Sequence, residues 1–245
     1  MSKFEDWINS TTFVNRGFYN NDEVPENSLK AINLAIQKNF GICIEVRALA
    51  DGTIVVFNDA TLGRMTNSDG FIYHSTLHEI NELSLLNSSE KIPTLTEVLD
   101  LVNGQVPIII NVKTLDEQEV YESTFEKYVW KTLQGYKGDY AIASANPYTL
   151  AWFKENAPKV KRGQISSLYK NSILPFKVKF KYKRMKLNYL SEPNFIMYKA
   201  SDLPNRFVKK IKDLPILANH VYSQEVFEKS KKQATSFIYD DYHVE

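Results

Sequence analysis

The 245-residue chain has one cysteine, Cys43, which excludes an internal disulfide and fits a reducing compartment. It lacks any apolar run long enough to span a bilayer, and residues 1–7 lack the apolar core of a signal peptide. Basic and acidic residues nearly cancel to a net charge of +1, which by itself favours neither nucleic acid nor a membrane as a partner. We therefore expect a soluble cytoplasmic protein with no nucleic-acid partner.

Internal repeats, low-complexity tracts and linkers are also missing. What is present is ordinary globular composition, with 43% hydrophobic and 24% charged residues, so the chain is able to bury a full core. The length is close to the roughly 250 residues that are typical of a (β/α)8 barrel. We expect one domain, residues 1–245.

Short β-branched runs alternate with helical patterns along the chain. We expect strands at 13–14, 42–46, 53–57, 106–112, 140–144, 163–165, 194–198, 216–217 and 236–239. We expect helices at 28–38, 94–102, 116–133, 147–156, 203–212 and 223–231. Several strands are apolar without alternation, as parallel strands buried on both faces are. The pattern predicts an α/β protein with a parallel sheet, as a closed barrel first and an open doubly wound sheet second.

A series of short motifs runs through the first half of the chain. They are Val14-Asn15-Arg16-Gly17, Pro25-Glu26-Asn27-Ser28, Gly41 to Val46, Asp51-Gly52, Val56-Phe57-Asn58-Asp59, Leu62 to Thr66, Pro93-Thr94-Leu95 and Ile110 to Lys113. Their order and spacing resemble the glycerophosphodiester phosphodiesterase (GDPD) family. Its fingerprint runs His-Arg-Gly, Pro-Glu-Asn, Glu-x-Asp, Asp-Gly, His-Asp and Glu-x-Lys. The resemblance implies a TIM-like barrel of the PLC-like phosphodiesterase type, with a small insertion at about 47–87 after the second strand.

Five positions of that fingerprint are replaced. The family histidines fall on Asn15 and Asn58, and the family metal carboxylates fall on Cys43, Glu45 and Asn111. The resemblance implies hydrolysis of a glycerophosphodiester to glycerol 3-phosphate and an alcohol, with the histidines as acid and base. A carboxamide does not titrate near neutral pH, so it orients a group but does not shuttle protons. We expect no intact catalytic residue.

The resemblance also implies a divalent cation, Mg²⁺ or Ca²⁺, held by carboxylates. These hard cations need oxygen ligands. Cys43 is a soft ligand, Asn111 offers one neutral carbonyl, and Glu45 is longer than the family aspartate. We therefore expect no cofactor and no tight metal site, and a divalent cation only if the chain is an active enzyme.

Several polar residues of the fingerprint remain. Arg16 and Lys113 lie where the family places basic groups near the phosphate, and such groups bind phosphate well. We expect a phosphate-binding group of Arg16, Lys113, Asn15, Asn58 and Asn111, supported by Glu26, Asn27 and Asp59. Alternatively, Glu45 or Asp59 pairs with these bases, and the site is a filled cluster of salt bridges.

The four histidines of the chain all lie outside the family histidine positions. His220 follows a late strand, where barrel residues point to the active-site end, and it is the best candidate for a substitute base. His74 and His78 are four residues apart, a spacing that brings both to one face of a helix and permits metal binding. That stretch is structural in the resembled family, so we expect no site there.

One segment departs from the even charge balance. Residues 177–186 read Lys-Val-Lys-Phe-Lys-Tyr-Lys-Arg-Met-Lys, and no acidic residue lies between Lys170 and Tyr189. This pattern suits contact with an anionic membrane surface, a polyanion or a protein partner. It also suits a solvated helix or loop whose apolar residues pack inward.

Three functional hypotheses follow. The first is a GDPD-like protein without catalysis, a pseudoenzyme that keeps a basic phosphate pocket for a glycerophosphate-type ligand or has a scaffolding role. The second is an active hydrolase of glycerophosphodiesters or related lipid or polymer head groups, with an altered and metal-free mechanism that uses His220 with Arg16 and Lys113. The third is an interaction protein that docks on a membrane or polyanion through residues 177–186.

Overall fold

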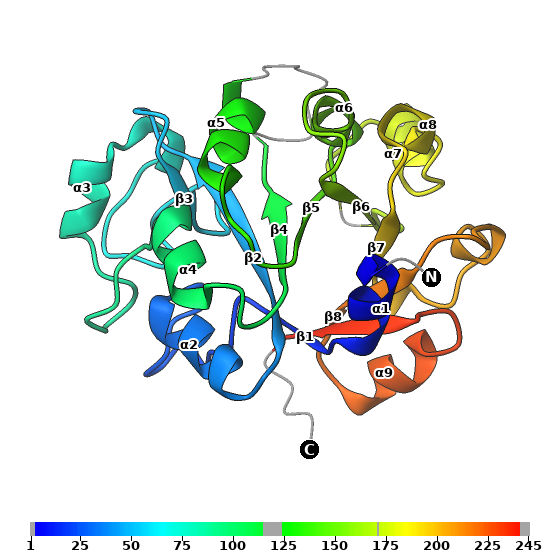
Figure 1. The fold of residues 1–245 in the computed structure, drawn as a ribbon, viewed down its shortest axis with the longest axis horizontal. Coiled ribbons are helices and arrows are strands. Elements are labelled where there is room, and N and C mark those ends of the chain that lie inside the picture. The colour runs from blue at the N-terminus through cyan, green and yellow to red at the C-terminus, as the bar shows by residue number, and fades with distance from the viewer. Residues whose placement is uncertain (1–2, 115–123, 171, 241–245) are drawn as a thin grey trace. The chain divides into compact units, whose positions relative to one another are not determined.

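The computed structural model describes residues 3–114, 124–170 and 172–240 (Figure 1). Within these residues the chain divides into two compact units. The first unit contains residues 14–114 and 124–140, and the second contains residues 3–13, 141–170 and 172–240. All eight residues predicted for the phosphate group and its support lie in the first unit.

Nine strands lie in the described ranges. They are β1 (Phe13–Asn15), β2 (Gly41–Ala48), β3 (Ile54–Val56), β4 (Ile108–Val112), β5 (Tyr140–Ser144), β6 (Lys161–Ser166), β7 (Phe195–Lys199), β8 (Ile216–Val221) and β9 (Ser236–Tyr239). The α-helices described there are α1 (Lys3–Ser10), α2 (Leu29–Gln37), α3 (Leu77–Glu82), α4 (Leu95–Val102), α5 (Thr124–Leu133), α6 (Pro147–Asn156), α7 (Phe176–Tyr182), α8 (Asn188–Ser191) and α9 (Gln224–Ser230). Short 3-10 helices are η1 (Ile72–His74), η2 (Ala200–Asp202) and η3 (Val208–Lys210).

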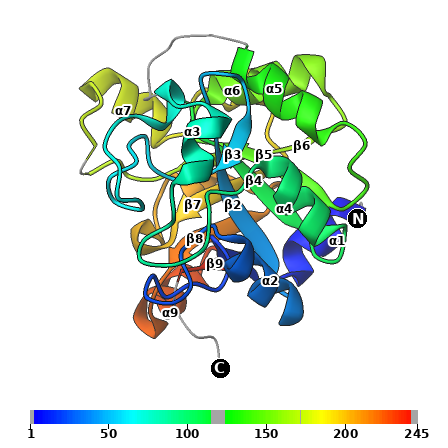
Figure 2. The same ribbon diagram turned by 90° about the vertical axis from the view of Figure 1, so that its left-hand side faces the viewer.

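Strand β2 is the centre of the first unit. It pairs in parallel with β4, which sets Glu45 opposite Asn111, and it pairs antiparallel with β3. Helix α2 packs against β2 and α4, as Figure 2 shows. Ser28 caps α2, and Thr94 forms a capping box with Glu97 at the start of α4. Both helix starts are confirmed, because their signals are local in the sequence.

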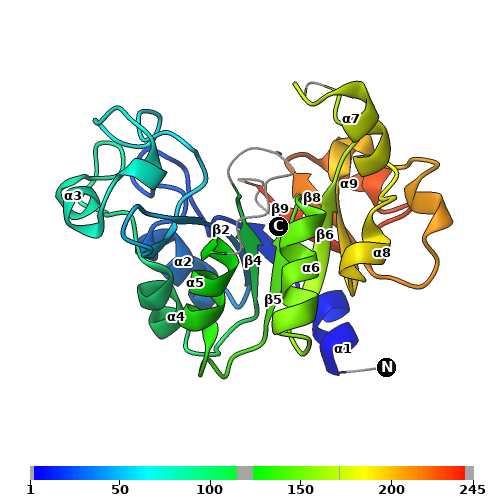
Figure 3. The same ribbon diagram turned by 90° about the horizontal axis from the view of Figure 1, so that it is seen from above.

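Strands β5 to β9 form the second unit. Each pairs in parallel with the next along the chain, from β5–β6 to β8–β9. Helix α6 starts at Pro147 with Asn146 as its cap, and it packs against β6 and α8 (Figure 3). Near its end β8 is irregular between Asn219 and Val221, and His220 there has a φ of 62°.

The strand order identifies the fold class. It runs β1-β9-β8-β7-β6-β5-β4-β2-β3, with an additional pairing of β1 with β2. An order that returns to its first strand belongs to a closed (β/α)8 barrel, and β3 is an antiparallel addition to β2. The predicted TIM-like barrel is confirmed over the open sheet.

The region predicted as an insertion has its own apolar cluster. Its buried members are Leu49, Val55, Phe57, Leu62, Met65, Ile72, Ile80, Leu85 and Ile92. Phe57, Leu62 and Met65 of this cluster lie close to Asn58, Asp59 and Arg64 in the sequence, so buried apolar neighbours anchor the loop that carries these polar residues. Their positions are therefore set by tertiary packing and by the strand that precedes them.

The prediction of a helix at 203–212 is wrong. Within that range the structure has η3 and no α-helix, and η2 ends just before it at Asp202. Pro204 has no backbone N–H, and the side chain of Asn205 accepts hydrogen bonds from the backbone N–H groups of Phe207 and Val208. These side-chain bonds replace helical ones. Residues 116–123 of another expected helix lie outside the described residues, and α5 occupies 124–133.

Among the residues that the structure describes, no helix has the length and apolar character needed to cross a bilayer.

Candidate functional site

A tight turn follows β1 and places Arg16. Arg16 and Gly17 both have positive φ, 62° and 78°. A Cβ on Gly17 would lie 2.5 Å from the carbonyl carbon of Ala31, so only glycine fits there. The backbone N–H of Arg16 donates to Cys43 O at 2.7 Å, and its carbonyl accepts from Asn27 N at 2.9 Å. The turn therefore holds Arg16 between β2 and the loop before α2.

The guanidinium of Arg16 lies between two carboxylates. Its Nε donates to Glu45 Oε1 at 3.1 Å, and its Nη1 donates to both oxygens of Glu26 at 3.2 Å. Burial disfavours the charge, but Glu45 and Glu26 outweigh that effect and raise the pKa of Arg16 above the usual arginine value. For Arg16, the alternative of a salt-bridge cluster therefore describes the site.

Glu26 joins two arginines. Arg64 donates to it from Nη2 at 2.6 Å and from Nη1 at 3.1 Å, and the Nε of Arg64 pairs with Asp59. Glu26 is 3% exposed, and burial opposes its ionisation. The bond from Arg64 and the charges of Arg16 and Arg64 outweigh burial and lower the pKa of Glu26. The sequence analysis did not assign Arg64 to the site, nor Asn21, whose Nδ2 donates to Glu26 Oε2 at 3.4 Å.

The three family metal positions hold one carboxylate, one thiol and one amide. Glu45 is buried, and its two oxygens accept from Arg16 Nε and from Asn27 Nδ2, the latter at 3.1 Å. Cys43 is 1% exposed, and Asn111 contributes a neutral amide beside Glu45. The described residues contain no group of three or more His, Cys, Asp or Glu side chains that would hold a metal ion. This donor set does not fit the divalent cation of the family.

The two family histidine positions hold amides in different settings. Asn15 is 2% exposed at the end of β1. Asn58 follows β3, donates from Nδ2 to Asp59 Oδ1 at 2.7 Å, and accepts from Arg47 Nε at its backbone carbonyl at 2.9 Å. Neither side chain titrates near neutral pH, so neither amide is suited to shuttle a proton.

Lys113 differs from the other cations of the site. It follows β4, where its backbone N–H donates to Val46 O at 3.1 Å, and its side chain is partly buried. Its ammonium has no ion pair among the described residues. Burial lowers the pKa of Lys113, and Arg47 and Arg16 lower it further against the pull of Glu45. Within the described residues, the site therefore holds a cation that is near Glu45 but makes no direct ion pair.

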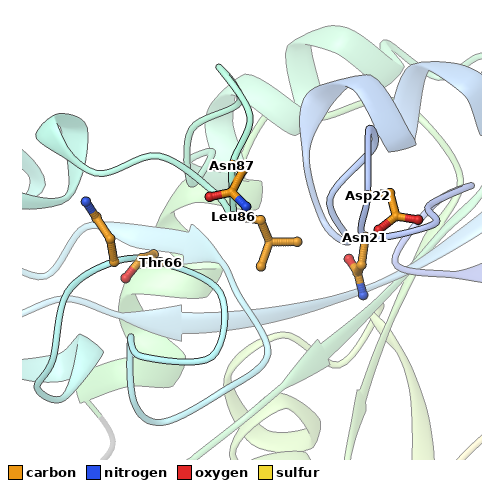
Figure 4. A pocket seen from close by; sticks show the side chains of 6 residues that line it. Asn21, Asp22, Thr66, Leu86 and Asn87 are labelled. Carbon is orange, nitrogen blue, oxygen red and sulfur yellow. The ribbon is translucent and has the colours of Figure 1, made fainter.

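A polar pocket of about 260 Å³ lies beside this network, between the loop before α2 and the insertion (Figure 4). It is lined by Asn21, Asp22, Thr66, Asn67, Leu86 and Asn87. Asn21 links the pocket to the charges, because its Oδ1 accepts from Glu26 N at 2.9 Å. None of the residues predicted to bind phosphate lines this pocket.

The histidines named from the sequence lie elsewhere. His220 is in the second unit, where its Nδ1 is 2.7 Å from Asp240 Oδ2, just past the end of β9. His74 ends η1 and His78 is in α3, with extended backbone at Ser75 and Thr76 between them. The four-residue spacing therefore does not bring His74 and His78 to one helix face.

Comparison with known proteins finds similar sequences and similar folds. The sequence model of the Glycerophosphoryl diester phosphodiesterase family matches residues 16–229. A glycerophosphodiester phosphodiesterase of Caldanaerobacter subterraneus is 34% identical over 149 residues, which are 57% of this chain and 60% of that protein. One from Bacillus altitudinis is 31% identical over 122 residues, 47% of this chain and 49% of that protein. The matched part of the chain thus spans 60% and 49% of the length of these two relatives.

Solved structures match over more of the chain. A phosphodiesterase of Oleispira antarctica in complex with its product sn-glycerol-3-phosphate has a TM-score of 0.77 at 21% identity, covering 95% of this chain and 93% of that one. A putative glycerophosphoryl diester phosphodiesterase of Silicibacter pomeroyi has a TM-score of 0.78 at 17% identity, covering 95% and 90%. At these identities the likeness shows the barrel fold.

Proposed function

The chain belongs to the glycerophosphoryl diester phosphodiesterase family, and we propose that it is a catalytically silent member that binds a glycerophosphate-type anion without cleaving it. The binding group is Arg16, Lys113 and the amides of Asn15, Asn58 and Asn111. Glu26, Asn27 and Asp59 support it by holding the two arginines and Glu45 in place.

Lys113 carries the ligand part of this proposal. A partly buried ammonium whose pKa is lowered despite the attraction of Glu45 raises the free energy of the fold, and a phosphate would supply a direct counter-charge. Arg16 adds a donor, because its Nη2 makes no hydrogen bond within the described residues. The product sn-glycerol-3-phosphate in the Oleispira antarctica structure is a phosphate anion of the kind proposed here as the ligand.

The amides carry the catalytic part. Hydrolysis near neutral pH needs groups that give and take protons, and loss of one such group typically costs about 10²- to 10⁴-fold in rate. Asn15 and Asn58 stand at the positions of both family histidines. The carboxylate of Glu45 accepts hydrogen bonds from Arg16 and Asn27.

Restoration of the family residues tests the proposal. The variant with Asn15→His, Asn58→His, Cys43→Glu, Glu45→Asp and Asn111→Glu is expected to hydrolyse glycerophosphocholine in the presence of Mg²⁺ or Ca²⁺. A matched variant with only the three metal positions restored is expected to bind the ion without turnover. Circular dichroism establishes that each variant is folded. If the fivefold variant folds and binds metal but stays inert, these replacements do not explain a loss of activity.

A second candidate rests on His220. A hydrogen bond from Nδ1 to the carboxylate of Asp240 leaves Nε2 as a proton acceptor, the arrangement of a general base. An active hydrolase of this kind predicts metal-free turnover of glycerophosphodiesters that His220→Ala abolishes and Asp240→Asn reduces. Equal turnover in the wild type and His220→Ala would remove this candidate, and so would the absence of turnover in the wild type.

A further inference from the structure

Helix α7 (yellow in Figure 3) lies in the most one-sided charge environment of the chain. Residues 177–186 contain five lysines and one arginine, and no acidic residue lies between Lys170 and Ser191. Against a net charge of +1 for the whole protein, these six cations form a local positive field. None of the six has an ion pair among the described residues.

Two large apolar side chains lie next to these cations and are open to water. Ile173 is 99% exposed and Phe176, the first residue of α7, is 78% exposed. Exposed apolar tips cost free energy in water, and they are typical of surfaces that enter another apolar phase. Their position directly before Lys177 joins the apolar tip to the basic run.

Phe180, one of the two other aromatics of α7, lies next to two of the cations. The Arg184 guanidinium lies 3.7 Å from the ring centroid of Phe180, and Lys186 Nζ lies 5.1 Å from it. The ring centroids of Phe176 and Phe180 lie 6.4 Å apart. Phe180 therefore connects the exposed tip with two of the cations, so the segment is a packed unit that presents both features together.

We propose that Ile173, Phe176 and the cations of 177–186 form a peripheral membrane-binding surface, in which lysines contact anionic lipid head groups and the two apolar tips enter the acyl boundary. Isoleucine has no aromatic face on which a nucleobase would stack, so Ile173 favours a lipid phase over a nucleic acid. The charge pattern favours an anionic leaflet. This surface does not depend on the phosphate-binding group of Arg16, Lys113, Asn15, Asn58 and Asn111, because the two share no residue.

Vesicle cosedimentation tests the surface. The wild type is expected to bind phosphatidylcholine vesicles that contain phosphatidylglycerol, and not pure phosphatidylcholine. Lys177→Glu with Lys179→Glu and Lys181→Glu is expected to weaken binding at least roughly 100-fold. Exposed lysines of the first unit provide a control with the same change of charge, Lys127→Glu, Lys131→Glu and Lys137→Glu, which is expected to retain most of the binding.

A second variant separates insertion from charge. Ile173→Ser with Phe176→Ser is expected to weaken vesicle binding by about 10-fold or more and to make the remainder more salt-sensitive. Tyr222→Ala, at an aromatic that is 55% exposed, is the control and is expected to bind like the wild type. Both variants replace exposed side chains, so they are expected to fold, as circular dichroism would verify. The proposal would be overturned if the wild type did not bind vesicles at low salt, or if both charge variants lost binding equally. It would also be overturned if the Ile173/Phe176 variant bound vesicles like the wild type and also bound heparin.

Discussion

Replacement of Lys113 by methionine separates a ligand-binding lysine from a structural one. Methionine keeps an unbranched side chain of similar length and removes the charge. The pKa of Lys113 is lowered by burial, so the folded state disfavours its ammonium. The unfolded chain therefore binds this proton more strongly, and the stability of the wild type rises as the pH rises through the folded pKa of Lys113.

The expected changes have opposite directions. Lys113→Met removes a cation without an ion pair among the described residues, so the free energy of unfolding at neutral pH is expected to rise by about 1 kcal/mol. A charge-assisted hydrogen bond to phosphate contributes about 1.5–3 kcal/mol. Its loss is expected to weaken binding of glycerol 3-phosphate roughly 10- to 150-fold. The variant is thus expected to be more stable and to bind less.

Urea unfolding and isothermal titration calorimetry measure the two quantities. Lys137→Met, at an exposed lysine of the same unit, is the matched control and is expected to change neither. The rise of stability at alkaline pH that Lys113 contributes is also expected to disappear in Lys113→Met. A variant that is less stable and binds glycerol 3-phosphate as the wild type does would refute the reasoning, because Lys113 would then be a structural residue.

Two further substitutions test the frame of the site. Glu26→Gln removes the buried carboxylate between two guanidinium groups and is expected to cost about 3 kcal/mol of unfolding free energy in urea, whereas Glu23→Gln, at an exposed position of the same loop, is expected to be neutral. Because the pKa of Glu26 is lowered in the fold, the stability that its carboxylate contributes is present above the unfolded pKa of about 4.3. That stability is lost as the pH falls through the folded pKa. Acid unfolding of Glu26→Gln that matches the wild type would contradict this. Gly17→Ala combines a positive φ with a contact of 2.5 Å to the backbone of Ala31 and is expected to cost about 3 kcal/mol in the same assay, whereas Gly135→Ala, with a φ of 95° and open space, is expected to cost about 1 kcal/mol. Equal costs for the two glycines would show that the contact is relaxed freely.

Local signals in the sequence predicted much of the fold. Parallel strands buried on both faces read as continuous apolar runs, which is why β2 and β4 were found within a few residues of their ends. Helix starts at Ser28 and Thr94 were found because a cap needs only the next three residues. The helix expected at 203–212 failed because the Asn205 side chain competes for backbone N–H groups, an effect that a periodicity argument does not include.

The sequence motifs located the polar residues of the first unit but did not predict how those residues pair. The motif positions named Arg16, Glu26 and Lys113, which lie at strand ends and in one loop of the first unit. The bond between Arg64 and Glu26 joins residues 38 positions apart, and no spacing rule in a sequence predicts such a contact. The same holds for Lys113, because the absence of an ion pair among the described residues depends on where every neighbouring carboxylate lies in space.

Calorimetric titration of the chelator-treated protein tests the central claim most directly. Mg²⁺ and Ca²⁺ are titrated first, and glycerol 3-phosphate and glycerophosphocholine follow. If the chain is catalytically silent and binds phosphate through Arg16 and Lys113, neither metal gives saturable heat. Glycerol 3-phosphate then binds saturably without metal, and Lys113→Met weakens that binding. Tight binding of Mg²⁺ or Ca²⁺, or binding of glycerol 3-phosphate only after metal is added, would contradict the assignment of Cys43, Glu45 and Asn111 as positions that hold no cation.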